Sequence, residues 1–294
     1  MKTKARNCPV CNSDNLFKWF TKIVLEQKYE YMKCANCSHV FVSKEPNIDW
    51  ESIYTSKKRL SKRESRDFFL QTRANELLNP NSTKDADDLF KNLSLLGAIP
   101  PLKLLDVGAG LGFISEQALE LVYEVISIEP SEYDCSILEN IKGLKIDQSD
   151  FLSSKYRKVD IVIFSHVLEH LMEPDRFIKK CREILNDGGI VVISVPNQAS
   201  ILSRISKAID PMICPPAHLS YFSIKSLEKL MLQNSFSKIF HTSSSRFQNN
   251  SIVRKTKNKY FKFLVKLPFL VINLLASITN SNQSLTRIYR IEKS

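Results

Sequence analysis

The chain has 294 residues, of which 43% are hydrophobic, enough for one large domain or two modest ones. Its net charge of +11 is uneven, because residues 104–245 hold 14 basic and 18 acidic residues, whereas residues 246–294 hold ten basic residues and one acidic residue. A nucleic-acid enzyme is more often basic around its active site, so the mildly acidic segment 104–245 disfavours that class of enzyme. The first residues lack the apolar segment of a signal peptide, so we expect a cytoplasmic protein whose seven cysteines are not paired in disulfides.

Two Cys-x2-Cys pairs stand near the N-terminus: Cys8, Cys11, Cys34 and Cys37. Each pair places two thiolates on one side of a tight turn, and two such turns complete a tetrahedral zinc site. Because cysteine fills all four positions, no ligand position is left for water, and we expect a structural zinc ion. The alternating segments 16–19 and 29–32 fit the strands of a zinc ribbon, which we place at residues 1–48. We expect His39, close to the second pair, to be a surface residue.

Strand-like and helical segments alternate through residues 100–245, after a stretch at 49–99 whose composition suggests a helical connector or lid. The strand-like segments are 102–108, 124–130, 144–147, 159–165, 189–195 and 237–243. The helical patterns are 113–122, 132–140, 174–185 and 223–234. This alternation predicts a parallel sheet covered by helices on both faces. Ligands of such sheets lie beyond the carboxyl ends of the strands.

The stretch Asp106–Gly112 contains three glycines between a predicted strand and a predicted helix. Glycines let the backbone approach a ligand closely, and the start of a helix presents free N–H groups. Glu129 ends the next predicted strand, a spacing that suits a carboxylate accepting hydrogen bonds from two ribose hydroxyls. The dinucleotide fingerprint would need glycine at position 113, where Phe113 stands. The pattern therefore disfavours NAD.

The stretch Asp106–Gly112 resembles motif I of the class I S-adenosylmethionine-dependent methyltransferases. The resemblance covers roughly residues 100–245 and implies an α/β fold with a Rossmann-like seven-stranded sheet, its last strand antiparallel. It also implies S-adenosylmethionine as the cofactor. Asp150 and Phe151, after the third strand, stand where the family contacts adenine, and Asp147 is a competing candidate. The cofactor-binding residues implied are Asp106, Gly108, Ala109, Gly110, Gly112, Glu129, Asp150, Phe151 and Ser165.

Methyl transfer to a hydroxyl or amine needs alignment and removal of a proton, and histidine suits the second task. His166, at the end of the fourth strand, and His218 are the candidate catalytic residues, whereas we expect His170 to be structural. Quinone-pathway O-methyltransferases that resemble this core can carry a divalent metal on a Glu-x-x-Glu-His pattern in this loop. Here His166 replaces the first glutamate, which departs from that pattern.

Residues 255–279 carry a basic stripe on a wide apolar helical surface. This pattern fits an interfacial helix, which would give peripheral contact with the inner face of the membrane. It fits equally a helix packed on the sheet or in a homodimer interface. We assign residues 246–294 to this basic amphipathic helix and a final strand, since 284–292 alternate like a strand that returns antiparallel to the sheet edge.

The segment 218–236 resembles one common in glycan-pathway methyltransferases. Our leading hypothesis is therefore methyl transfer to a small molecule, a sugar or lipid-linked glycan precursor. Zinc ribbons precede such cores in enzymes of nucleotide-sugar chemistry and also in enzymes that methylate ribosomal RNA. An RNA methyltransferase is thus the enzymatic alternative, disfavoured by the charge distribution. A membrane-docked zinc-ribbon interaction protein is the alternative without catalysis.

Overall fold

The computed structural model describes residues 6–24, 26–44, 46, 67, 70, 71, 74, 80–200, 203, 212–244 and 284–292. The amphipathic helix expected at 255–279 lies outside these residues, as do most of residues 49–79 in the connector expected at 49–99. In the described part of the chain, no helix is long and apolar enough to cross a membrane.

Contacts divide the chain into two compact units, which are described separately. The first, here called the ribbon unit, comprises Met1–Pro46, His166–Ile178 and Ile193–Tyr289. The second, the glycine-loop unit, comprises Asn47–Ser165, Lys179–Val192 and Arg290–Ser294.

Seven strands form one sheet in the order β10-β11-β8-β7-β4-β5-β6. Their bounds are β4 Lys103–Val107, β5 Glu124–Ile128, β6 Lys145–Asp147, β7 Val159–Ser165, β8 Leu185–Pro196, β10 Phe236–Ser244 and β11 Ser284–Ile291. β4 pairs in parallel with both β5 and β7, and β5 pairs in parallel with β6. The expected seven-stranded α/β fold with an antiparallel last strand is confirmed.

β11 was expected at the edge of the sheet, and that expectation is wrong, because β11 lies between β10 and β8. Its side chains are mostly buried, and Thr286 shares a hydrogen bond of 2.9 Å with Ser194 of β8. On the other side, Arg287 Nη1 donates to the carbonyl of Thr242 in β10 at 2.9 Å. β10 takes the edge, where its exposed Lys238 and His241 are tolerated, since edge strands commonly carry polar side chains.

In the described part of the glycine-loop unit the longer helices are α3 Pro80–Leu95, α4 Phe113–Glu120 and α5 Glu132–Leu138. α6, Pro174–Ile184, follows the short 3₁₀ helix η1, Leu168–His170, and α8 is Ile224–Leu232. Ser223 caps α8, because its hydroxyl accepts the N–H of Ser226 at 3.2 Å in a capping box. Strand β4 lies inside the sheet, between β7 and β5, and its Leu104 and Leu105 are fully buried.

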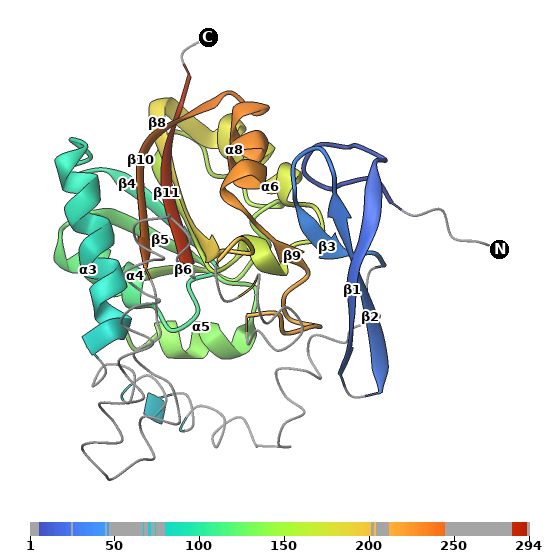
Figure 1. Ribbon diagram of the computed structural model, residues 1–294. Helices are drawn as coiled ribbons and strands as arrows, with labels where there is room; N and C mark the ends of the chain where they lie inside the picture. Colours follow the sequence, from blue (N-terminus) through green and yellow to red (C-terminus); the bar gives the residue numbers. More distant parts are fainter. Residues whose placement is uncertain are drawn as a thin grey trace, which may run out of the picture. The chain divides into compact units, whose positions relative to one another are not determined.

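A second sheet of four strands, in the order β1-β2-β3-β9, belongs to the ribbon unit (Figure 1). β1 Leu16–Val24 and β2 Gln27–Cys34 form a long hairpin, and β3 Val40–Val42 follows. β9, Ser220–Tyr221, comes from far along the chain and pairs antiparallel with β3, with Val40 opposite Tyr221. The ribbon sheet is therefore completed by a segment that the sequence analysis assigned to the core.

Candidate functional site

The glycine loop after β4 adopts a conformation that favours glycine. Gly108, Gly110 and Gly112 have φ angles of 70°, 51° and 77°, in the left-handed region. Gly108 N–H donates to the carbonyl of Ile128 at 2.7 Å, which ties the loop to the end of β5. A Cβ at Gly112 would lie 2.6 Å from side-chain carbons of both Leu138 and Ile141. The loop thus needs glycine for its backbone angles and, at Gly112, also for space.

Glu129 follows β5 and is 6% exposed. Its Oε2 accepts the N–H of Gly110 at 3.1 Å, and its Oε1 accepts the N–H of Ser131 at 3.0 Å. Burial raises the pKa of Glu129, although these two backbone hydrogen bonds partly offset the rise. Each carboxylate oxygen has a second lone pair, so the fixed carboxylate can still accept two ligand hydroxyls. This geometry fits the ribose of S-adenosylmethionine.

Asp106 is 2% exposed and lies beneath the loop rather than at its surface. Ser115 donates its hydroxyl to Asp106 Oδ2 at 2.6 Å and also shares a 2.6 Å hydrogen bond with Ser127. Burial raises the pKa of Asp106 to about 6. Ser115 was not predicted from the sequence, although a polar residue in the first helical turn after a glycine loop is a recognisable signal. A direct contact between Asp106 and the cofactor stays a prediction.

The remaining predicted cofactor residues occupy different environments. Asp150 is exposed, and its Oδ1 accepts the N–H of Leu152 at 2.7 Å. Phe151 is 2% exposed and packs edge-to-face on Phe164, with ring centroids 5.5 Å apart. Ser165, the last residue of β7, is half-buried, as is Ala109 in the loop. Their roles toward adenine and the cofactor stay predictions.

Three of these positions follow neighbouring parallel strands. Gly108 comes after β4, Glu129 after β5, and Ser165 ends β7, and β4 pairs with both other strands. The carboxyl ends of parallel strands meet at one edge of a sheet, which is where ligands bind in this class of fold.

The four N-terminal cysteines form a compact cluster of thiols, with every sulfur within 4.8 Å of the others. The sulfurs of Cys8 and Cys37 are 3.5 Å apart, as are those of Cys11 and Cys34. Tetrahedral zinc with Zn–S bonds of about 2.3 Å places its sulfurs about 3.8 Å apart. A disulfide needs about 2.05 Å, and all four thiols are free. The cluster therefore fits a zinc ion, and the identity of the metal stays a prediction.

The two cysteine turns repeat one local structure. Asn12 N–H donates to the carbonyl of Cys8, and Ser38 N–H donates to the carbonyl of Cys34, both at 2.9 Å. Asn12 and Ser38 both have positive φ, 56° and 64°. A hydrogen bond from Cys37 lowers the pKa of Cys8, which favours the thiolate form that a metal ion binds.

His39 is fully buried, so the expectation that it is a surface residue is wrong. Its ring stacks on Phe41 at 5.9 Å and lies 4.7 Å from the ring of Phe222. Burial lowers the pKa of His39 to about 3, which keeps the ring neutral. The pairing of β9 with β3 brings Phe222, which directly follows β9, against the His39 ring, and the local sequence does not reveal this pairing.

His166, one of the two predicted catalytic residues, directly follows β7. Its N–H donates to the carbonyl of Ser194 at 2.8 Å, and its backbone has a positive φ of 58°. Its Nδ1 lies 3.1 Å from Oε1 of Glu169. The His166 side chain is 32% exposed, whereas that of Glu169 is 1% exposed. An accessible imidazole is thus held by a buried carboxylate, a partner that the sequence analysis missed.

His170 and His218 lie next to this pair, with ring centroids 4.9 Å apart. The loop that carries His218 is held to η1 because Leu219 N–H donates to the carbonyl of Glu169 at 2.7 Å. Burial lowers the pKa of His218, although Glu169 partly offsets the effect. Burial raises the pKa of Glu169, but the hydrogen bond from His166 and the three nearby histidines bring it below its usual value. The structure thus places His170 in the cluster, whereas the sequence analysis expected only a structural role.

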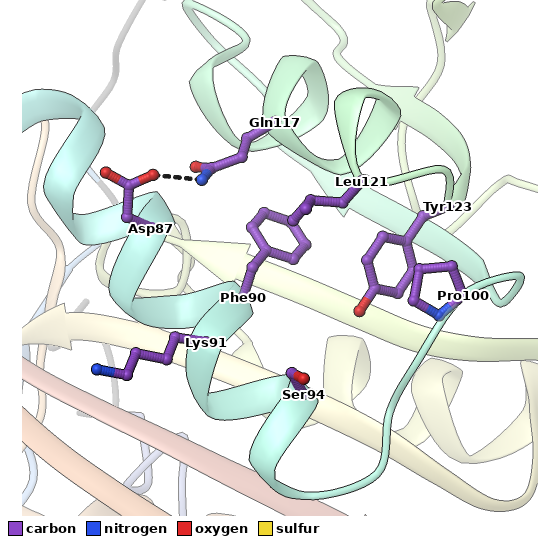
Figure 2. Close-up of a pocket in the computed structure, with 8 residues that line it drawn as sticks. All are labelled: Asp87, Phe90, Lys91, Ser94, Pro100, Gln117, Leu121 and Tyr123. Carbon is purple, nitrogen blue, oxygen red and sulfur yellow. Dashed lines mark hydrogen bonds between the residues drawn. The ribbon is translucent and has the colours of Figure 1, made fainter.

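A surface pocket of about 290 Å³ lies between α3 and α4 (Figure 2). Its walls include Phe90 and Tyr123, whose ring centroids are 5.5 Å apart, and Gln117, which donates to Asp87. None of the eight residues drawn in Figure 2 belongs to the predicted site. We interpret this pocket as a gap left where α3 packs against α4, with no role in the predicted site.

Comparison with known proteins agrees with this geometry. Residues 70–239, more than half of the chain, match the family model described as a methyltransferase domain. Ubiquinone biosynthesis O-methyltransferase from Cereibacter sphaeroides is 31% identical over 120 residues, covering 38% of this chain and 49% of that protein. The protein of the same name from Bradyrhizobium diazoefficiens is 28% identical over 120 residues, covering 37% and 45%. The chain thus spans about half the length of the curated relatives it matches.

Solved structures share the fold at low sequence identity. Magnesium protoporphyrin IX methyltransferase from Synechocystis PCC 6803, with bound SAH, superposes with a TM-score of 0.52 and 16% identity, covering 79% of this chain and all of that one. A 1,6-didemethyltoxoflavin-N1-methyltransferase from Burkholderia thailandensis gives 0.50 and 12%, covering 88% and 98%. The chain therefore belongs to the methyltransferase domain family and has the class I S-adenosylmethionine-dependent methyltransferase fold.

Proposed function

We propose that this protein transfers the methyl group of S-adenosylmethionine to a hydroxyl group of a small molecule. The observation that carries the proposal is Glu129, a buried carboxylate fixed by the N–H of Gly110 in the glycine loop. It is the arrangement that a nucleoside ribose needs, and it stands in a chain of the methyltransferase domain family. The two relatives described above are O-methyltransferases by name, which supports oxygen as the acceptor atom.

The cofactor supplies an electrophilic methyl group on a sulfonium. The residues of this chain bind the cofactor, align the acceptor hydroxyl with the methyl group and remove the proton of that hydroxyl. Glu129 holds the ribose hydroxyls, while Gly108 and Gly110 let the backbone approach the ligand. His166 is the proposed general base. With its Nδ1 hydrogen donated to Glu169, the neutral ring keeps a lone pair on Nε2 that can accept the hydroxyl proton.

Glu169 is a positioning residue in this scheme. It fixes the ring and the tautomer of His166, and its negative charge stabilises the imidazolium that forms on proton transfer, as a buried carboxylate does in serine hydrolases. His218 is the second candidate base. We favour His166, because about a third of its side chain is exposed and because it directly follows Ser165 at the end of β7.

For the acceptor, we propose a sugar or lipid-linked glycan precursor, on the basis of the resemblance of residues 218–236. A phenolic quinone precursor is the second candidate, favoured by the relatives named for ubiquinone biosynthesis. We propose that the enzyme works in the cytoplasm, with residues 255–279 in contact with the inner face of the membrane. RNA methylation and a role without catalysis are the remaining alternatives, and the experiment below separates them.

The test has two steps. Calorimetry first measures binding of S-adenosylhomocysteine to the wild-type chain, to Glu129→Gln and to Glu139→Gln, a control at an exposed position near the end of α5. Loss of charge-assisted hydrogen bonds should weaken binding to Glu129→Gln by about 10- to 150-fold, with no change in the control. If the wild-type chain does not bind, or both variants bind equally, the proposed function is wrong.

The second step offers labelled S-adenosylmethionine with separate pools of nucleotide sugars, lipid-linked glycan precursors, polyprenylated phenols and ribosomal RNA. Label in the sugar or glycan pool supports the leading acceptor, and label in phenols supports the second. Label in RNA alone would overturn the small-molecule proposal, and its binding should then weaken steeply with salt. Absence of transfer to any pool, with cofactor binding intact, would favour the role without catalysis.

A further inference from the structure

Glu169, His170 and His218 bring one oxygen and two nitrogens together, all within 4.8 Å of one another. Glu169 is 1% exposed, and its two oxygens differ, because Oε1 bonds to His166 while buried Oε2 has no hydrogen-bond partner among the described residues. A buried carboxylate oxygen is costly unless a donor or a cation satisfies it. This oxygen therefore indicates a hydrogen-bond donor or a cation at the site.

Both histidines are oriented to supply lone pairs. His170 Nδ1 lies 2.7 Å from the carbonyl oxygen of Ala217, and His218 Nδ1 lies 2.6 Å from that of Met212. A carbonyl oxygen only accepts, so Nδ1 carries the hydrogen in both rings, and the neutral rings keep a lone pair on Nε2. Metal-binding histidines are commonly fixed in this way by a backbone carbonyl on the other nitrogen.

The set of donors departs from the Glu-x-x-Glu-His pattern of quinone-pathway enzymes. His166 stands at the first position of that pattern and bonds to Glu169. A third donor comes instead from His218, 49 residues after Glu169, and no local motif includes it. Magnesium and calcium prefer oxygen ligands, whereas imidazole nitrogens suit zinc and the neighbouring transition metals.

We propose that Glu169, His170 and His218 bind a divalent transition-metal ion of the zinc class, at a second site separate from the four cysteines. Three protein ligands leave one position of a tetrahedral ion open, as in reactive rather than purely structural zinc sites. The ion satisfies the buried Oε2 of Glu169 and uses both Nε2 lone pairs. Metal binding here does not depend on the proposed methyl transfer.

A hydrogen-bond network without metal is the competing account of the same cluster. Because Nδ1 of each ring is committed to a carbonyl, only a protonated ring could donate from Nε2 to Glu169. The two accounts therefore differ in a measurable way. The metal site takes up an ion, and the network takes up a proton and no ion.

The experiment uses the full chain, stripped with a chelator and reloaded with Zn²⁺ or Co²⁺, and measures metal per chain by elemental analysis. We expect two ions in the wild-type chain and one in His218→Ala. The Co²⁺-loaded variant should keep the thiolate absorption of the cysteine site. His241→Ala, at an exposed position on β10, is the matched control and should keep two ions.

Glu169→Gln is the second variant and keeps the shape of the side chain. It should weaken the second site by at least about tenfold in metal titrations, with unchanged circular dichroism. Excess Mg²⁺ should not displace the ion. One ion in the wild-type chain, or two tightly held ions in both variants, would overturn the proposal. S-adenosylhomocysteine binding, measured on the same samples, reports separately on the proposed function.

Discussion

Replacing Gly112 by alanine tests whether the glycine loop is set by space as well as by backbone angle. Gly97 offers a matched control, because both glycines have φ of 77°. A Cβ at Gly97 would meet nothing within 4 Å. A Cβ at Gly112 would lie 2.6 Å from Leu138 Cδ2 and 2.6 Å from Ile141 Cδ1, two carbons of buried side chains. The two variants share the backbone strain, and only Gly112→Ala adds a clash.

The expected magnitudes follow from these two terms. Left-handed backbone costs a non-glycine residue about 1–2 kcal/mol, which is the whole expected effect of Gly97→Ala. Crowding a packed core costs about 1–3 kcal/mol more, so Gly112→Ala should lower the free energy of unfolding by about 2–5 kcal/mol. The clashing atoms are ends of side chains that can shift, which places the crowding term within this range rather than above it.

Urea unfolding of both variants measures the difference, and calorimetry with S-adenosylhomocysteine provides a second reading. Gly112 is the N-cap of α4, so displacement of this residue should also weaken cofactor binding, whereas Gly97→Ala should leave it unchanged. Equal destabilisation by the two substitutions would show that the contacts with Leu138 and Ile141 have no energetic weight. If Gly112→Ala unfolds with the same free energy as the wild-type chain, both the backbone-strain cost and the crowding cost are refuted.

Three further predictions concern the base, the buried carboxylate and the cysteines. His166→Gln should lower kcat by about 10²- to 10⁴-fold with unchanged S-adenosylhomocysteine affinity, while His241→Gln should change neither. Ser115→Ala should cost about 1–3 kcal/mol at pH 8 and less at pH 5. The reason is that burial raises the pKa of Asp106 to about 6, so the charge that needs the Ser115 hydroxyl is present above that pH. Removal of zinc with a chelator should increase amide hydrogen exchange throughout β1, β2 and β3, and zinc should reverse the effect.

Each of these predictions has an outcome that contradicts it. A wild-type kcat in His166→Gln would remove the proposed base. The raised pKa of Asp106 alone makes the folded state less stable as pH rises from about 4 to about 6, because the folded state then holds more protons than the unfolded state. A Ser115→Ala penalty independent of pH would contradict a charged Asp106. Unchanged exchange after complete metal removal would show that the thiols need no ion.

Features that depend on residues close together in the sequence could be predicted from local patterns. The glycine loop, the end of β5 at Glu129 and the four cysteines each depend on residues close in sequence, so spacing and composition reveal them. The alternation of segments likewise predicted the strands and helices of the core, within a few residues at most ends. These features are set by periodicity and by turns, which one sequence displays directly.

Features built from distant segments were missed. No periodicity shows that β9 pairs with β3, so His39 was expected at the surface although it is fully buried. The position of β11 inside the sheet depends on β10 taking the edge, which is a competition between two strands. Likewise, Glu169 gains its role only when the loop carrying His218 folds against η1. Contacts of this kind are decided by tertiary packing.

The pairing of β3 with β9 has a consequence for the synthesis of the chain. Val40 leaves the ribosome long before its partner Tyr221, 181 residues later in the sequence. Until then β3 presents an open strand edge with three apolar side chains, Val40, Phe41 and Val42, a hazard for association between nascent chains. Zinc bound early by the four cysteines would hold the β1–β2 hairpin in register until β9 has been synthesised. Completion of the ribbon sheet, and with it the cluster around Glu169, is therefore a late event in folding.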